Sequence, residues 1–273
     1  MRKIKKIVKG TKAVDGAGVH MTRVLSKENV VDFDPFLMLD SFDSNDYNDY
    51  IKGFPYHPHR GIETITYLVK GKINHKDSLG NEGSIEDGQS QWMSAGSGIL
   101  HEEMPQMSES MLGIQIWLNL PSDKKMIKPA YFDITKDMIG VQKTNYGEIK
   151  VISGEYDGIV GVNPPNIKAQ IYDISIESKN EIEINTIKDH NVFIFLIKGN
   201  AIVDGEVIAE KSAILFGEGD KIKISSSDNK LQIMFFSAKP LHEPIAWGGP
   251  IVMNTKEELM LAFKELDGGE FIK

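Results

Sequence analysis

Short runs of alternating apolar and polar residues dominate this chain, whereas the 3.6-residue period of amphipathic helices is scarce. Alternation places every second side chain on the same face, which is typical of β-strands with one buried face. The clearest runs lie at residues 64–69, 113–118, 170–176 and 192–197, and Gly, Asn and Asp separate them. Many short strands joined by turns predict an all-β protein made of sandwiches, jelly rolls or barrels.

One helix is predicted, close to the C-terminus. Asn254 or Thr255 can cap its first turn, which also contains Glu257 and Glu258. Apolar residues follow at helical spacing, and a pair of glycines at 268–269 ends the pattern. We therefore expect a short C-terminal helix attached to an otherwise strand-built chain.

An internal repeat divides the chain. The segments 67–71 (YLVKG) and 195–199 (FLIKG) match over five positions, and each ends an apolar strand at a glycine turn. Self-similarity of this kind predicts two copies of one β-domain. We expect an N-terminal domain over residues 1–135 and a C-terminal domain over residues 145–273 that includes the helix.

Composition narrows the classes of function. The chain has 31 basic and 39 acidic residues, a net charge of −8 and no cysteine. This charge disfavours direct binding to nucleic acid, and the lack of cysteine excludes disulfides and thiolate ligands. No run of about eighteen apolar residues is present, so no membrane span is expected. The sequence predicts a soluble, cytoplasmic protein, or a nuclear one if the source is eukaryotic.

Two pairs of potential metal ligands carry the chemical information. His57 and His59 are two residues apart, as are His101 and Glu103. Residues two apart on a strand point the same way, so two such pairs on facing strands could direct three imidazoles and one carboxylate at one point. This ligand set suits Fe(II), Mn, Ni, Co or Zn and leaves coordination positions open.

Spacing alone leaves the identity of the carboxylate open. If no bulge intervenes at Gly61, Glu63 and Ile65 share the face of the two histidines at 57 and 59, and that face continues into an apolar barrel interior. Glu63 is therefore an alternative to Glu103. Glu102 has the opposite parity and should face away.

The same residues resemble the motifs of the cupin superfamily. Its first motif is HxH followed by a Glu and a Gly, matched here by His57, His59, Glu63 and Gly71. Its second motif ends in Gly-x-x-His, matched by residues 98–101, although the usual upstream proline is missing. The resemblance implies two tandem cupin domains of the jelly-roll or β-barrel type. In the second copy Asn185 and Ile187 occupy the positions of the first two histidines, so only the first copy is expected to bind a metal.

The resemblance narrows to the pirin family of two-domain cupins. The segments that carry it are 34–37, 57–64, 91–105, 115–121 and 243–255. In that family the metal, usually iron, is held by the two histidines of HPH and by the His and Glu of an HxE segment. Carried over residue by residue, the resemblance implies His57, His59, His101 and Glu103 as ligands. Glu63 would then orient an imidazole through a hydrogen bond.

The pirin resemblance also implies a function. Several pirin-like proteins open flavonols such as quercetin with O2 as quercetin 2,3-dioxygenases. By this analogy the cofactor is one divalent metal ion, with Fe(II) as first choice and Mn, Ni, Co, Cu or Zn as alternatives. Glu103 would be the catalytic residue that also accepts the substrate proton. Two alternatives remain: a non-enzymatic, iron-dependent regulator that binds protein partners, or another cupin reaction, such as an isomerisation, on a different small molecule.

Other residues are given simpler interpretations. His75 is predicted to be a surface residue, and His20, His190 and His242 to be structural. The acidic loop 43–49 lacks the acceptor pattern of a calcium loop and could form a rim over the metal site. Trp92 and Trp117 are expected to anchor the core, and Gln115 is a candidate for contacting substrate.

Overall fold

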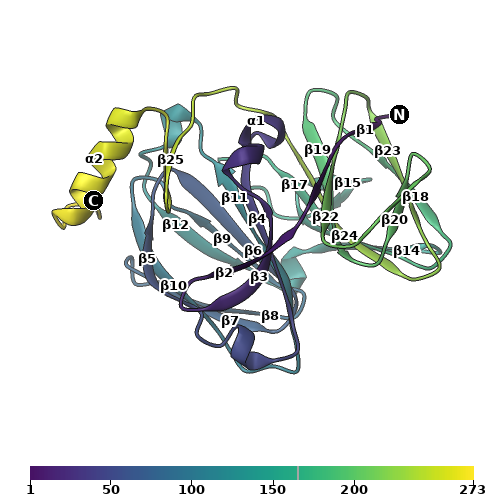
Figure 1. Ribbon diagram of the computed structural model, residues 1–273, viewed down its shortest axis with the longest axis horizontal. Coiled ribbons are helices and arrows are strands. Elements are labelled where there is room, and N and C mark those ends of the chain that lie inside the picture. The colour runs from purple at the N-terminus through teal and green to yellow at the C-terminus, as the bar shows by residue number, and fades with distance from the viewer. Residues whose placement is uncertain (165) are drawn as a thin grey trace. The chain divides into compact units, whose positions relative to one another are not determined.

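The structure, a computed structural model, describes residues 1–164 and 166–273 (Figure 1). The chain forms two compact units. We call residues 12–30, 35–135 and 241–273 the N-terminal unit, and residues 1–11, 31–34 and 136–240 the C-terminal unit. Both consist mainly of strands, as the alternating pattern predicts. No helix in the described part of the chain is both long and apolar enough to cross a membrane.

Two antiparallel sheets build the N-terminal unit. The larger has the order β12-β9-β6-β11-β4-β3-β2 and the smaller the order β5-β10-β7-β8. The strands of the larger sheet are β2 (Thr11–Asp15), β3 (Val19–Leu25), β4 (Phe36–Ser44), β6 (Ile62–Lys70), β9 (Ser90–Ser94), β11 (Met111–Asn119) and β12 (Ala130–Ile134). Those of the smaller sheet are β5 (Phe54–His59), β7 (Lys72–Asp77), β8 (Glu82–Glu86) and β10 (Ile99–Pro105).

The residues that alternate in the sequence as apolar and polar alternate in these strands between a buried and a more exposed face. Along β10 buried and half-buried residues strictly alternate, and β7 buries every second residue. Among the buried apolar clusters of the unit, two are formed mainly by strand residues. One contains Val19, Met21, Phe42, Tyr50, Leu68, Ile73, Ile85 and Met111, and the other Leu37, Met38, Ile62, Met93, Ala95, Ile99, Trp117 and Val252. Short helical turns in this unit are η1 (Lys27–Asn29), η2 (Tyr47–Asp49) and η3 (Ser122–Lys124), whereas η4 (Lys136–Met138) and all of α1 (Val30–Phe33) but its first residue belong to the C-terminal unit.

The C-terminal unit repeats this plan. Its larger sheet has the order β1-β22-β19-β24-β17-β14-β13, its smaller sheet the order β18-β23-β20-β21, and β15 and β16 form a separate pair. The larger sheet contains β1 (Ile4–Lys9), β13 (Gly140–Thr144), β14 (Gly147–Ser153), β17 (Gln170–Ile176), β19 (Asn191–Lys198), β22 (Ser212–Phe216) and β24 (Leu231–Ala238). The others are β15 (Glu155–Tyr156), β16 (Ile159–Val160), β18 (Glu181–Asn185), β20 (Ala201–Val203), β21 (Glu206–Ile208) and β23 (Lys221–Ser226).

The internal repeat corresponds to equivalent strands. β6, which carries YLVKG, lies between β9 and β11, and β19, which carries FLIKG, lies between β22 and β24. The interior of the C-terminal unit is a continuous apolar cluster that includes Ile174, Ile194, Ile214, Ile233 and Phe235. Isoleucine and phenylalanine side chains offer no metal ligand, so this barrel has a packed core where the other unit has histidines.

The two ends of the chain belong to different units than the sequential division at residues 1–135 and 145–273 predicts. β1 hydrogen-bonds β22 at the edge of the C-terminal unit's large sheet, the position that β12 fills beside β9 in the N-terminal unit. The segment 241–273 belongs to the N-terminal unit. It consists of the hairpin β25 (Ala246–Gly248) and β26 (Ile251–Met253), followed by α2 (Lys256–Asp267).

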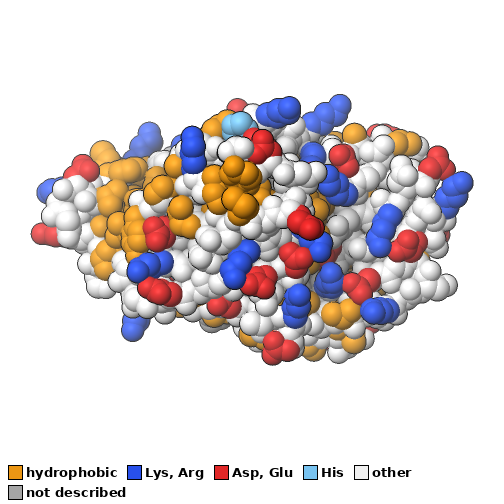
Figure 2. Space-filling view, turned by 90° about the horizontal axis from the view of Figure 1, so that it is seen from below, with side chains coloured by type: hydrophobic (Ala, Val, Ile, Leu, Met, Phe, Trp, Pro, Cys, Tyr) orange, Lys and Arg blue, Asp and Glu red, His pale blue; other side chains and the backbone are white. Residues whose placement is uncertain are grey.

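Helix α2 confirms the predicted C-terminal helix. Thr255 is its N-cap, and its hydroxyl and the Glu258 carboxylate form a reciprocal capping box. Few of its side chains are buried, and Met260 and Leu261 are exposed. Figure 2 shows hydrophobic side chains gathered at the end of the view where α2 lies, and acidic and basic side chains interspersed elsewhere on that face.

Candidate metal centre

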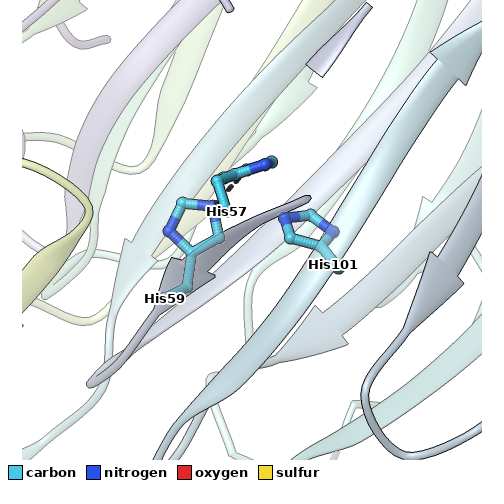
Figure 3. Close-up of side chains that lie close together, drawn as sticks. All are labelled: His57, His59 and His101. Carbon is cyan, nitrogen blue, oxygen red and sulfur yellow. Dashed lines mark hydrogen bonds between the residues drawn. The ribbon is translucent and has the colours of Figure 1, made fainter. Parts of the chain in front are cut away.

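Three histidines converge on one point of the small sheet of the N-terminal unit. β5 and β10 are antiparallel neighbours, and their register places His57 directly opposite His101. His59 lies two residues further along β5, so its ring is on the same face. One nitrogen of each of the three rings lies within 4.8 Å of the other two (Figure 3). The pairing that the HxH spacing predicts is therefore present for the histidines.

Backbone carbonyls orient two of the rings. The Nδ1 atom of His57 lies 2.9 Å from the carbonyl oxygen of Pro55, and that of His59 lies 3.1 Å from the carbonyl oxygen of Pro250. A carbonyl can only accept, so both Nδ1 atoms carry the proton and both Nε2 atoms present a lone pair. The two Nε2 atoms are 3.1 Å apart. Two imidazoles bound at about 2.1 Å and at right angles on one ion would be about 3.0 Å apart, so the spacing fits a metal.

His101 gives an independent indication of a bound cation. Its side chain is 1% exposed, and within the described part of the chain neither ring nitrogen has a hydrogen-bond partner. Burial lowers the pKa of His101 well below its ordinary value, and the neighbouring His59 adds to this effect. Burial likewise lowers the pKa of His59 to about 3. The buried rings are therefore neutral at physiological pH, which is the form that binds a metal.

Glu103 lies beside this cluster but makes a different set of contacts. It is 3% exposed, and its Oε1 atom accepts hydrogen bonds from Thr66 Oγ1 at 2.9 Å and from Gln91 Nε2. Its Oε2 atom accepts from Gln115 Nε2 at 2.7 Å. Among the residues that the structure describes, the group with mutually close ligand atoms comprises His57, His59 and His101 without Glu103. Ligation by Glu103 stays a prediction.

The role predicted for Glu63 is wrong, because the strand is interrupted at Gly61. β5 ends at His59, β6 begins at Ile62 in the other sheet, and Gly61 has a φ of +76°. A Cβ atom at Gly61 would lie 2.0 Å from the carbonyl oxygen of Val252. On β6 it is Thr66, of even parity, that reaches Glu103, so Glu63 faces the opposite side. The imidazoles at 57 and 59 are oriented by backbone carbonyls instead.

The prediction that His75 is a surface residue is also wrong. It is 2% exposed, its Nε2 atom lies 3.1 Å from Asp77 Oδ2, and its ring stacks on Tyr131 at 3.8 Å between centroids. β7 pairs with β10 so that His75 is opposite Glu103. The alternation of Ile73, His75 and Asp77 along β7 is the sequence signal that could have placed this histidine inside.

A cavity of about 750 Å³ adjoins the histidines. It is lined by His57 and His59 and by the aromatic side chains of Phe54, Trp117 and Trp247. Gln115, predicted as a substrate contact, lines it as well. The charged side chains in its wall are Asp15, Arg23, Lys27, Glu28 and Asp40. Trp117 and Trp92 are buried as expected of core anchors, and Trp117 also packs edge-on against His59.

Two weaker predictions are resolved by these contacts. Residues 43–49 are absent from the described lining of the cavity, so the rim role suggested for this loop is not seen. Asp46 instead caps the turn η2 by accepting from the backbone of Asn48. His20 is an exposed partner of Asp49 at 3.1 Å, and His190 contacts the Ser237 hydroxyl at 3.0 Å. Neither of these two histidines belongs to the cluster.

Known families match both halves of the chain. The sequence model described as Pirin matches residues 18–118, and the one described as Pirin C-terminal cupin domain matches residues 171–272. The first match spans β5, β10 and the three histidines. The second covers the strands of the C-terminal unit from β17 to β24 and extends through α2.

Individual relatives agree with the family models. A pirin-like protein of Caulobacter vibrioides is 39% identical over 275 residues, which is 99% of each chain. A Pseudomonas aeruginosa protein provisionally named as a quercetin 2,3-dioxygenase is 38% identical and covers 95% of this chain and 94% of its own. The crystal structure of a quercetin 2,3-dioxygenase from Acinetobacter baumannii is 28% identical, with a TM-score of 0.90 over 99% of this chain and 98% of that one. The chain therefore belongs to the pirin family of two-domain cupins.

Proposed function

We propose that this protein is a metal-dependent dioxygenase that opens flavonols such as quercetin with O2. The observation that carries the proposal is the convergence of three imidazoles, two of them buried, beside an aromatic cavity whose wall includes His57 and His59. Relatives that span nearly the whole chain are named for this activity. We further propose Fe(II) as the resident metal and Glu103 as the fourth ligand, because three imidazoles and a carboxylate suit this ion.

The protein residues supply binding, orientation and proton transfer. His57, His59 and His101 would hold the ion, and when bound it would supply the Lewis acidity and redox chemistry that O2 and a flavonol require. The carbonyl groups of Pro55 and Pro250 fix the tautomers of two of these rings. Glu103 would accept the proton of the flavonol 3-hydroxyl. Its hydrogen-bond donors hold the carboxylate in place for that task.

The cavity wall favours a neutral, hydroxylated aromatic ligand. Trp117 and Trp247 lie 5.9 Å apart between ring centroids and provide flat apolar surface. Three acidic and two basic side chains line the same cavity, which is an excess of one negative charge. Carboxylates accept hydrogen bonds from phenolic hydroxyls but repel anions. A polyphenol such as quercetin suits this wall better than an aromatic acid.

The experiment that tests the proposal is O2 consumption by the Fe(II)-loaded protein with quercetin. His101→Ala and Glu103→Ala should each abolish turnover while the circular dichroism spectrum stays native. His20→Ala, which removes an exposed histidine outside the cluster, should retain it. Wild-type rates of O2 consumption in His101→Ala or Glu103→Ala would contradict this mechanism. A metal-loaded wild type that consumes no O2 with any flavonol would favour the regulatory alternative instead.

A further inference from the structure

Gln115 lies between the cavity and the Glu103 carboxylate. It is on β11, with Asp40 of β4 and Thr66 of β6 as its cross-strand partners. Its side chain lines the cavity and is 7% exposed. Glu103, Thr66 and Gln91 are not among the described residues that line the cavity. Of the three donors to Glu103, Gln115 alone therefore touches both the carboxylate and the space where a ligand would bind.

The two ends of the Gln115 amide have different environments. Its Nε2 atom donates to Glu103 Oε2 at 2.7 Å and lies 3.4 Å from Thr66 Oγ1. Its carbonyl oxygen makes no hydrogen bond with any residue that the structure describes, although the side chain is nearly buried. A nearly buried amide oxygen without a partner is an acceptor available to a ligand donor.

Gln91 offers a direct contrast. Its Nε2 atom also donates to Glu103, but its carbonyl oxygen lies 3.3 Å from the Tyr131 hydroxyl. Both ends of the Gln91 amide therefore have protein partners, and the residue lies outside the cavity lining. Of these two amides, that of Gln91 has protein partners at both ends, whereas that of Gln115 has protein partners at its Nε2 end and belongs to a residue that lines the cavity.

We propose that Gln115 is a positioning residue that accepts a hydrogen bond from a hydroxyl of the cavity ligand and, through the same amide, fixes the Glu103 carboxylate. The inference rests on the proposed function, because it assigns a hydroxylated aromatic as the ligand. A hydrogen bond to an amide oxygen polarises the amide and strengthens the bond that its N–H donates. Ligand binding and the orientation of Glu103 are then coupled, and by linkage each favours the other.

Quercetin binding without turnover tests the coupling. The dissociation constant is measured by quenching of tryptophan fluorescence, with Ni2+-loaded protein under argon, so that no reaction occurs. Gln115→Met keeps the length of the side chain and removes both polar groups. We expect it to raise the Kd about tenfold, the effect of losing one hydrogen bond of ordinary strength. Gln91→Met, the matched change outside the cavity, also removes a donor to Glu103 but no cavity contact, so it should raise the Kd by clearly less than Gln115→Met does.

A double-mutant cycle separates coupling from independent effects. Glu103→Gln should change the quercetin Kd in the wild-type background and have a much smaller effect in the Gln115→Met background. If Gln115→Met does not fold, Gln115→Asn keeps the amide but shortens its reach, and the same cycle applies. A native circular dichroism spectrum and equal Ni2+ content are required of every variant.

The outcomes distinguish this inference from the proposed function. If the wild type binds neither Ni2+ nor quercetin, the proposed function fails and removes the basis of the inference. If the wild type binds both, but Gln115→Met binds quercetin equally well, only the inference is overturned. Equal losses in Gln115→Met and Gln91→Met would also overturn it, because they would indicate a purely structural role.

Discussion

Replacement of Arg60 by alanine should release the C-terminal segment from the N-terminal unit. Arg60 follows His59 of the histidine cluster and is 2% exposed. Its Nη1 atom donates to Glu265 Oε2 at 2.6 Å, and its Nη2 atom to the carbonyl oxygen of Phe271 at 2.9 Å. The guanidinium also lies 4.2 Å from the centroid of the Phe271 ring. One side chain of the cupin barrel therefore fastens both α2 and the residues after it.

The expected loss of docking free energy can be derived from these contacts. Hydrogen bonds to charged groups contribute about 1.5–3 kcal/mol each, and a desolvated cation–π contact adds about 2 kcal/mol. Such terms are not additive, and loss of one partner of a buried ion pair typically costs about 3–5 kcal/mol. The buried cluster beneath α2 is small and consists of Ile251, Met253, Ala262 and Phe271. We therefore expect docking of the segment to weaken by about 3–5 kcal/mol.

Hydrogen exchange of the α2 amides measures this loss directly. Arg60→Ala should speed their exchange by a factor of more than about one hundred, since 1.4 kcal/mol is tenfold. Ni2+ affinity should fall as well, because the Pro250 carbonyl that orients His59 belongs to the same segment. Lys273→Ala removes the exposed partner of Glu265 and should change exchange by less than about tenfold. Wild-type exchange rates in Arg60→Ala would mean that this side chain does not hold α2 in place.

Two further predictions concern the same corner of the barrel. Gly61→Ala should lower the free energy of unfolding in urea by more than about 3 kcal/mol, because its Cβ atom would clash with Val252. Gly80 also has a positive φ but lies in open space, so Gly80→Ala should lose only about 1–2 kcal/mol. Equal losses in the two variants would contradict the clash. Burial lowers the pKa of Lys125 to about 7, so above that pH the unfolded chain binds more protons than the folded chain. The free energy of unfolding should therefore rise by up to about 1.4 kcal/mol per pH unit from pH 7 toward 10, relative to Lys125→Met. Parallel pH profiles for the two proteins would show that the buried amine does not titrate in this range.

The sequence was sufficient where the relevant periodicity was local. Side-chain alternation places His57 and His59 on one face of β5, and the structure brings them opposite His101 on β10. The internal repeat likewise predicted two similar barrels, because YLVKG and FLIKG fill equivalent central strands. The capping signals around Thr255 predicted the start of α2. Each of these features follows from a short local pattern: a spacing of two residues, a five-residue segment that recurs, or a capping sequence.

The features that sequence could not supply depend on contacts between distant residues. The carbonyl that orients His59 comes from Pro250, 191 positions later in the chain, and a backbone group leaves no residue-type signal. Gly61 breaks the expected continuation of β5 because the Val252 backbone approaches it closely. His75 is buried because β7 pairs with β10, a contact between strands that the sequence around His75 does not indicate.

Equilibrium dialysis against Ni2+, followed by elemental analysis, shows whether the three histidines form one metal site. The wild type should retain one ion per chain, because His101 otherwise has two buried ring nitrogens without partners in the described structure. His101→Ala should retain far less, with a native circular dichroism spectrum. A wild type that dialyses free of metal, or a His101→Ala protein that still retains one ion per chain, would mean that these histidines do not form a metal site.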